Sequence, residues 1–342
     1  MLLSCISKLL EIFINFSILN LVAFWRIKNF FTFIFSEKMR VFLTGGSGFI
    51  GSFLTFALVN QGHEITILSR NIKKLPLFPP GARILEADPT KPGSWQKTAG
   101  DHEVIINLAG FSIFNRWTKE GKKQIFDSRI LTTNNLAEAL SHRKEKETHF
   151  LSASGVGYYG FQGDTFVDEH AGPGDDFLAR VACAWEQAAL AAQRYGARVV
   201  LCRIGIVLGR QGGAFARLVP LFKCCLGAPL GSGKQWFSWI HVQDLASIFL
   251  FLLQHPELEG PVNVTAPHPV RNQELTQTLS TFLHKPHLPF PLPEFFLRLT
   301  HGESADLFLK GQRVLPQKLL RKGFVFTFPT LPDALKDLLR QN

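Results

Sequence analysis

Short apolar runs alternate with longer stretches in which apolar residues recur at helical spacing, and this alternation begins at Met39. The run "RVFLTGG" is rich in β-branched and aromatic residues, which is typical of a buried parallel strand. The next stretch, "FIGSFLTFALVNQGH", repeats its apolar residues with the period of a helix and stops at Gly62. Five further apolar runs follow, at residues 63–70, 82–90, 102–110, 148–155 and 197–209. Alternating strands and helices predict an α/β fold, a Rossmann-like doubly wound parallel sheet with helices on both faces.

The first 38 residues have a different pattern, because they are rich in Phe, Ile and Leu and contain no Gly or Pro. Their longest uncharged run, Ile12–Trp25, has 14 residues, short of the roughly 20 that span a bilayer. Three interpretations stay open for residues 1–38: a hydrophobic extension that is not part of the native fold, an interfacial membrane anchor, or a targeting segment. We favour the extension, because Met39 is the only methionine besides Met1 and stands directly before the first strand.

We expect two folded regions after this extension. Residues 39–265 carry the alternation of strands and helices together with insertions on the substrate side, and we interpret them as a nucleotide-binding domain. From Pro261 onward, across the end of this region, "PVNVTAPHPVRNQELTQTLSTFLHK" predicts a strand, a loop and a helix with Asn272 as its cap. The remainder predicts short helices and one strand. We interpret residues 266–342 as a small mixed C-terminal domain on the substrate side, which shapes a pocket or an oligomer contact.

Three glycines stand where the first strand meets the first helix, at Gly45, Gly48 and Gly51. Glycines at this junction let the backbone turn tightly and approach a pyrophosphate closely, while the helix N-terminus faces the anion. A glycine triplet alone is a weak signal, but its place between a strand and a helix makes it specific. The sequence therefore predicts a dinucleotide site at the carboxyl ends of the strands.

The end of the second strand indicates which dinucleotide is preferred. An NAD site usually has an Asp or Glu there to accept a hydrogen bond from the ribose 2'-hydroxyl. This chain has Ser69 and Arg70 instead. A hydroxyl and a guanidinium can hold the additional phosphate of NADP, which a carboxylate would repel. We therefore expect NADP(H) rather than NAD as the cofactor.

Composition narrows the function classes. The 342 residues are 46% hydrophobic, enough for a large core, and the formal charge of +10 suits a partner that carries phosphate or carboxylate. No run of five or more basic residues occurs, so we expect no nucleic-acid partner. The five cysteines show neither a zinc spacing nor a paired disulfide framework, and we expect no metal site. Reduced thiols favour a cytoplasmic protein.

Several motifs in order resemble a known superfamily. "TGGSGFIG", "NLAG", "SAS", "RIGIVLG" and "WIHVQDLA" resemble the extended short-chain dehydrogenase/reductases, which include NAD-dependent epimerases and dehydratases. "GVGYYG", "GKQWFSWIHVQDLA" and the tail "LLRKGFVFTFPTLPDALKDLL" resemble its YfcH-like group of epimerase family proteins, which carry a C-terminal domain of unknown function. The resemblance runs from Met39 to the end of the chain. It implies that Asp88 in "EADPT" and Ala109 in "NLAG" also contact the cofactor.

The same resemblance implies a catalytic Ser, Tyr and Lys, with Tyr and Lys spaced as Y-x-x-x-K on one helix. Residues four apart share a helix face, so the ammonium can lower the pKa of the phenol. Ser154 fits the serine position at the end of the fifth strand. No Y-x-x-x-K exists in this chain, and Leu178 and Ala182 stand where Tyr and Lys would be. Tyr158 and Tyr159, just past Ser154, are the alternative acid–base candidates; packing over the cofactor is the competing interpretation.

Substrate-binding candidates lie in two segments. "NRWTKEGKKQIFDSR" follows the fourth strand and offers Arg116 and Trp117 near the ligand edge. "GSGKQWFSWIHVQD" is opened by glycines and offers Lys234, Gln235 and His241, whose cationic and aromatic neighbours suit a sugar or an anion. His241 has a second interpretation, in which it ties the loop to the start of the following helix together with Asp244.

The sequence as a whole predicts an NADP(H)-binding oxidoreductase or epimerase-like enzyme with a small polar substrate, which the resemblance extends to nucleotide-linked sugars. The alternative is a nonenzymatic NADP-binding sensor or scaffold, which the missing Tyr-Lys pair favours. A homo-oligomer is compatible with either. The sequence assigns neither the substrate nor the direction of hydride transfer.

Overall fold

The computed structural model describes residues 38–71, 81–143 and 147–340. The predicted N-terminal extension, apart from Lys38, lies outside the described residues, so its three interpretations stay predictions. The chain from Met39 to Asn342 forms one compact unit. Within the described ranges, no helix is both long enough and apolar enough to cross a membrane.

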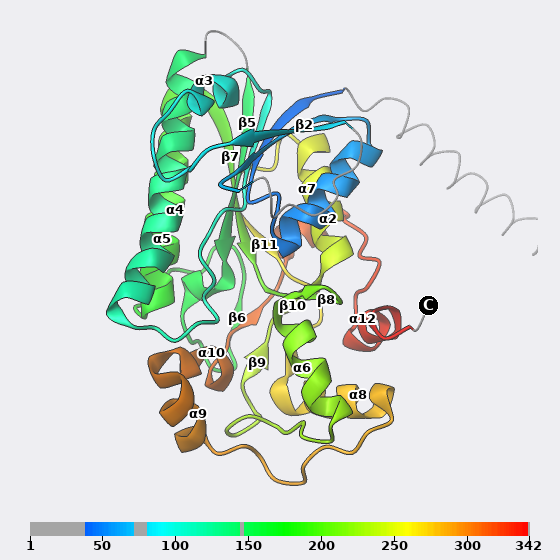
Figure 1. Ribbon diagram of the computed structural model, residues 1–342. Coiled ribbons are helices and arrows are strands. Elements are labelled where there is room, and N and C mark those ends of the chain that lie inside the picture. The colour runs from blue at the N-terminus through cyan, green and yellow to red at the C-terminus, as the bar shows by residue number, and fades with distance from the viewer. Residues whose placement is uncertain (1–37, 72–80, 144–146, 341–342) are drawn as a thin grey trace, which may run out of the picture. The chain divides into compact units, whose positions relative to one another are not determined.

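A seven-stranded sheet, in which every neighbouring pair of strands is parallel, forms the centre of this unit, in the order β11-β7-β5-β4-β1-β2-β3 (Figure 1). This confirms the predicted doubly wound fold. The strands are β1 (Arg40–Thr44), β2 (Glu64–Ser69), β3 (Ala82–Glu86), β4 (Val104–Asn107), β5 (Thr148–Gly155), β7 (Ala197–Ile204) and β11 (Gly260–Val264). The strand predicted from "PVNV" at Pro261 is β11, and it completes the edge of this sheet.

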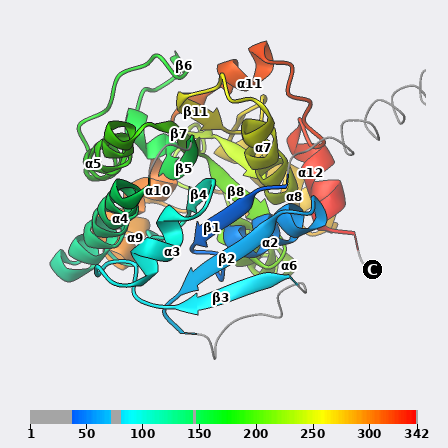
Figure 2. The same ribbon diagram turned by 90° about the horizontal axis from the view of Figure 1, so that it is seen from above.

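Helices cover both faces, and each face has its own apolar core. On one face α2 (Phe49–Asn60) and α7 (Val242–Gln254) pack on the sheet, and on the other lie α3 (Trp95–Gly100), α4 (Lys119–Ala139) and α5 (Phe177–Leu190) (Figure 2). Side chains alternate along a strand, so Val41 and Leu43 enter the core of α2 and α7, whereas Phe42 enters that of α3 and α4. Two buried faces explain why the strands are continuous apolar runs.

The predicted sixth strand, residues 197–209, is divided in the structure. It breaks at Gly205 into β7 and β8 (Ile206–Gly209), and β8 leaves the central sheet to pair with β10 (Trp239–His241). A Cβ at Gly205 would lie 2.8 Å from the carbonyl oxygen of Ser238. The backbone can therefore pass this crowded point only as glycine, and the chain turns there toward the C-terminal elements.

Most of the remaining elements gather at the carboxyl end of the sheet, around α6 to α10 in Figure 1, whereas α11 (Gln317–Arg321) packs beside β11. The helices are α6 (Gly213–Lys223), α8 (Asn272–Leu283), α9 (Glu294–His301), α10 (Asp306–Leu309), α11 (Gln317–Arg321) and α12 (Leu331–Leu338). The short strands are β6 (Phe166–Val167), β9 (Trp236–Phe237), β12 (Val270–Arg271) and β13 (Arg313–Val314). The predicted cap of α8 was wrong by one residue, because Arg271 and not Asn272 occupies the N-cap position. The Asn272 side chain accepts a hydrogen bond from the backbone amide of Leu230.

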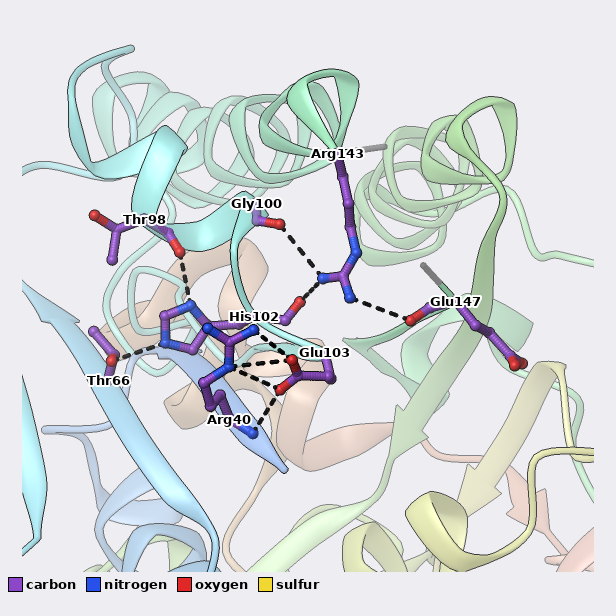
Figure 3. A network of polar contacts seen from close by, with 8 residues as sticks. All are labelled: Arg40, Thr66, Thr98, Gly100, His102, Glu103, Arg143 and Glu147. Carbon is purple, nitrogen blue, oxygen red and sulfur yellow. Dashed lines mark hydrogen bonds and ion pairs between the residues drawn. The ribbon is translucent and has the colours of Figure 1, made fainter. Parts of the chain in front are cut away.

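A polar network ties the strands together at their amino ends, opposite this region (Figure 3). Arg40, which begins β1, donates to both carboxylate oxygens of Glu103, which precedes β4. His102 lies between the Thr98 carbonyl and the Thr66 hydroxyl, at 2.7 and 2.9 Å. Arg143 donates to the backbone carbonyls of Gly100 and Glu147. These contacts fix the end of the sheet that is remote from the predicted ligand edge.

Candidate functional site

The glycine turn forms an open cradle between β1 and α2. Gly45 has φ +73°, and a Cβ there would lie 2.7 Å from the backbone of Leu108. A Cβ on Gly51 would lie 2.2 Å from the carbonyl oxygen of Gly45, so side chains at these positions would collide with the backbone of the turn. Gly48 caps α2 without a side-chain hydrogen bond, and the first turn of α2 contains no acidic residue. Free amides at a helix N-terminus suit an anion, so these residues fit the diphosphate of a dinucleotide.

No carboxylate ends β2. Ser69 is the last residue of the strand and is buried, whereas Arg70 is exposed directly after it. Asp88, beyond β3, accepts hydrogen bonds from the backbone and the hydroxyl of Thr90. Burial raises the pKa of Asp88, but the Thr90 hydrogen bonds and the charge of Arg70 outweigh it, so the pKa is lowered. The positive charge of Arg70 therefore reaches the Asp88 carboxylate, so both residues belong to the same edge of the sheet.

The end of β4 is held rigidly beside the cradle. The Asn107 side chain accepts hydrogen bonds from the Thr44 hydroxyl, at 2.7 Å, and from the backbone amide of Ala109, at 3.3 Å. It donates to Thr133 on α4 at 2.8 Å. Ala109 therefore lies against the glycine turn, at the edge where the sequence placed the cofactor.

A cavity of about 480 Å³ opens at the carboxyl ends of the strands. It is lined by the end of β5, by α5, by the segment after β7 and by residues 303–312 of the C-terminal region. Aromatic rings form much of the lining, including Phe49, Trp117, Phe177, Trp185, Trp236 and Phe308. Its volume suits a small organic molecule.

Ser154 lines this cavity and is held from behind by a buried ion pair. Its hydroxyl donates to Glu186 at 2.8 Å. Both oxygens of Glu186 accept from Arg203, each at 2.8 Å, and both side chains are nearly inaccessible to solvent. Since the proton of Ser154 points to Glu186, the lone pairs of its oxygen are free for a hydrogen-bond donor in the cavity.

The two predicted tyrosines lie outside the cavity lining. Tyr159 is fully buried; its hydroxyl donates to Asn263 at 2.7 Å and accepts from Arg203 at 3.0 Å. Burial raises its pKa to about 12. The ring of Tyr158 covers the guanidinium of Arg203, 3.4 Å from the ring centroid, and burial raises the pKa of Tyr158 as well. Both phenols therefore pack against the ion pair.

Leu178 and Ala182, which stand at the expected positions of Tyr and Lys, do line the cavity. Of the substrate candidates, Trp117 and Gln235 also line it. Trp117 donates to the carbonyl of Ile113, and Gln235 donates to the carbonyls of Leu230 and Phe308. These bonds fix both side chains at the cavity wall.

The other three substrate candidates lie elsewhere. Arg116 and Lys234 are exposed and are not part of the lining. His241 is buried at the start of α7, accepts from the amide of Gln243 and lies 3.3 Å from Asp337 of α12. Burial lowers its pKa to about 4. His241 therefore caps α7, but Asp244 is not its partner as the second interpretation expected, because Asp244 accepts from the amides of Thr327 and Phe328.

Arg129 lines the cavity but is absent from the sequence-based candidates. A signal was available, because Ile125, Arg129 and Leu136 fall at positions of α4 that share the inner face. A charged residue on an apolar face is uncommon.

As for metals, the described residues contain no group of three His, Cys, Asp or Glu side chains that could hold an ion.

The profile of the NAD dependent epimerase/dehydratase family matches residues 41–265, and that of a domain of unknown function, DUF1731, matches residues 292–338. An Arabidopsis thaliana protein, "Epimerase family protein SDR39U1 homolog, chloroplastic", is 39% identical over 89% of this chain and 88% of its own. "Epimerase family protein YfhF" of Bacillus subtilis is 38% identical over 88% of this chain and 98% of its own.

A crystal structure of human epimerase family protein SDR39U1 with NADPH is similar to this fold, with a TM-score of 0.76 and 34% identity, and covers 88% of this chain and 99% of its own. A UDP-glucose 4-epimerase of Thermus thermophilus in complex with NAD shares the fold at 22% identity, with a TM-score of 0.68 over 88% of this chain and 97% of its own. The chain therefore belongs to the NAD dependent epimerase/dehydratase family of extended short-chain dehydrogenase/reductases and carries a DUF1731 domain at its C-terminal end.

Proposed function

We propose that this protein is an NADP(H)-dependent oxidoreductase whose small substrate occupies the aromatic cavity. The observation that carries the proposal is the glycine cradle at the carboxyl edge, beside a cavity that reaches Ser154. When bound, NADP(H) supplies or accepts a hydride at its nicotinamide ring. Gly45, Gly48 and Gly51 would hold its diphosphate, and Asp88 and Ala109 would contact it on either side.

The preference for NADP(H) rests on Ser69 and Arg70. A guanidinium at the end of β2 can form charge-assisted hydrogen bonds to a 2'-phosphate, and no carboxylate competes there. The human relative with NADPH supports this choice, whereas more distant structures of the same fold hold NAD. Because structures of this fold hold either cofactor, the preference for NADP(H) over NAD has to be measured on this protein.

Ser154 is the residue we place against the reacting oxygen. Because its hydroxyl donates to Glu186, its oxygen would accept the hydrogen of a substrate hydroxyl and pass a proton toward Glu186. Neither Tyr158 nor Tyr159 faces the cavity, so we assign them a packing role. Replacing Ser154 by Ala is expected to lower kcat about a hundredfold and to leave the affinity for NADPH unchanged.

Calorimetric titration of the protein with NADPH and with NADH tests the cofactor proposal. We expect NADPH to bind at least about tenfold more tightly, since one charge-assisted contact is worth about that factor. Arg70→Ala should remove this preference, while Arg83→Ala, which removes the same charge from exposed β3, should keep it. Equal binding of the two cofactors would refute the preference.

Absence of binding by either cofactor would refute the oxidoreductase proposal itself. Tight NADPH binding without turnover of any screened alcohol or carbonyl compound would favour a nonenzymatic NADP-binding sensor or scaffold. Neither the family profiles nor the relatives support that alternative. A cytoplasmic location and a homo-oligomer stay predictions.

A further inference from the structure

The acidic groups that line the cavity are already neutralised or hydrogen-bonded. Asp176 caps α5 and accepts from the amides of Leu178 and Ala179. Glu303 pairs with Lys122. Asp306 pairs with Arg298 at 3.1 Å and with Lys310 at 3.0 Å. Lys310, which also lines the cavity, therefore has an acidic partner. Each acidic side chain of the lining therefore already has hydrogen-bond donors or a cation as partners.

Two arginines of the lining, in contrast, have no acidic partner among the described residues: Arg129 and Arg217. Arg217 is exposed on α6, 5.2 Å from the ring centroid of Phe114. Arg129 is partly buried, and burial lowers its pKa to about 10. A guanidinium with that pKa stays charged near pH 7. The lining therefore offers two guanidinium groups to an anion.

One edge of the Arg129 guanidinium is used by the protein and the other edge is free. Nη1 donates to the carbonyls of Phe111 and Ile125, both at 3.0 Å. Nε and Nη2 form no hydrogen bond within the described part of the chain. The Nε–Nη2 edge is the one that binds a carboxylate through two parallel hydrogen bonds. The bonds at Nη1 fix the orientation of that edge in advance.

A second unused donor belongs to a side chain that packs on Arg129. Trp185 lines the same cavity, is 7% exposed, and packs its ring 5.0 Å from the Arg129 guanidinium carbon. Its indole Nε1 is buried and has no hydrogen-bond partner among the described residues. Buried donors without partners are uncommon and costly in folded proteins. A ligand that brings oxygen acceptors would satisfy both side chains.

We propose that Arg129 binds the carboxylate of the substrate, which makes the substrate a small acid with an apolar or aromatic body. This inference rests on the proposed function and names the substrate class of the same site. Aromatic rings of the lining would pack against the apolar body, and Arg129 would anchor the acid end.

This anion site and the proposed diphosphate site are built on helices from opposite faces of the sheet. The cradle opens at α2, which packs on one face of the sheet, whereas Arg129 belongs to α4 on the other face (Figure 2). The guanidinium lies against Gly110, since a Cβ there would be 3.0 Å from its central carbon. Arg129 therefore lies at the end of β4 and lines the cavity from the side of α4, while Phe49 lines it from the start of α2.

The test compares an acid with its neutral amide. The full chain is first saturated with NADPH and is then titrated with hydrocinnamate and with hydrocinnamamide, which share one aromatic body. We expect the acid to bind at least about tenfold more tightly, the value of one charge-assisted contact. Arg129→Gln should reduce this ratio to about one, Arg129→Lys should retain part of it, and Arg217→Gln should retain most of it.

Equal affinities of acid and amide for the unmodified protein would overturn the proposal, and this comparison needs no variant to fold. An unchanged ratio in a folded Arg129→Gln protein would also overturn it. So would a loss of NADPH affinity of tenfold or more, because Arg129 would then be a ligand of the cofactor. If the unmodified protein binds no NADPH, the proposed function fails, and the same acid-to-amide ratio measured without cofactor still decides the role of Arg129.

Discussion

Arg203 carries a buried positive charge, and Glu186 is its acidic partner. Both oxygens of Glu186 accept hydrogen bonds from the Arg203 guanidinium, whose only other hydrogen bond within the described residues goes to the Tyr159 hydroxyl at 3.0 Å. Glu186→Gln would leave the guanidinium buried without a counter-charge. Breaking a buried pair by removing one partner costs about 3 to 5 kcal/mol, so we expect a loss of that size in denaturant unfolding.

An exposed pair provides the matched control for this variant. Glu303 pairs with Lys122, and the Glu303 side chain is 51% exposed. Glu303→Gln should change the free energy of unfolding by less than about 1 kcal/mol, the usual range for surface pairs. Similar losses in the two variants would contradict the structural role of Glu186.

The pair Arg40–Glu103 predicts a pH dependence (Figure 3). Burial raises the pKa of Glu103, but hydrogen bonds from the side chain and backbone of Arg40 outweigh it and hold the pKa at about 2, against 4.5 for a free group. The unfolded chain therefore takes up this proton first. The stabilisation is complete above the unfolded pKa and is lost as the pH falls from about 5 toward 2.

Glu103→Gln tests this dependence. Because both side chains are partly exposed, we expect the variant to lose only about 1 kcal/mol of unfolding free energy at pH 7. The difference from the unmodified protein should shrink steadily in unfolding curves measured at pH 5, 4 and 3. Glu138→Gln on the exposed side of α4 is the control. A difference that stays constant with pH would rule out ionisation of Glu103 as its source.

At this scale the sequence identified residues whose role follows from backbone position. Gly45 and Ser154 lie at predictable ends of strands and Gly51 in the first turn of the helix after β1, and the structure places them at the glycine turn and the cavity. The roles of Tyr159 and His241 depend on partners 104 and 96 positions away in the chain, Asn263 and Asp337. Such partners are set by tertiary packing, which one sequence does not reveal.

Among the elements, the junction of β1 and α2 carries the strictest spatial requirement. A Cβ on Gly51 would lie 2.2 Å from the Gly45 carbonyl oxygen and 2.6 Å from the Cα of Gly46. Gly51→Ala must therefore move the helix away from the turn. We expect NADPH affinity to fall at least about tenfold by calorimetry, because the turn and the helix N-terminus would no longer meet the diphosphate together.

Gly172→Ala controls for the loss of a glycine, since a Cβ there would meet no atom within 4 Å. It should bind NADPH like the unmodified protein. Unchanged NADPH affinity in a folded Gly51→Ala variant would show that the cradle is not the cofactor site.

The elements themselves were largely predictable because strands buried on both faces are continuous apolar runs. The break of residues 197–209 into two strands was not predictable from the sequence. Both strands are apolar, and the break occurs where Gly205 packs against Ser238. The cap of α8 was misplaced by one residue for a related reason, since the amide of Leu230 engages Asn272. Local patterns predict that an element exists better than they predict its ends.

At the scale of the whole unit, the C-terminal region shares the main core. Leu319, Leu331 and Leu335 belong to the same apolar cluster as Val41 of β1 and Leu245 of α7. Asp244 of α7 accepts hydrogen bonds from the amides of Thr327 and Phe328, both at 2.9 Å. The predicted boundary at residue 265 thus separates segments that contribute to one core, and we expect them to unfold together.

Leu335→Ala tests this expectation. Leu335 on α12 is fully buried, and truncation of a buried leucine costs about 2 to 5 kcal/mol. If residues 39–340 unfold cooperatively, far-UV circular dichroism and tryptophan fluorescence should report one transition, shifted as a whole to lower denaturant. Val325→Ala, at a side chain that is 82% exposed, should leave the transition in place. Two separate transitions, with only the smaller one shifted, would instead show that the C-terminal region folds as an independent domain.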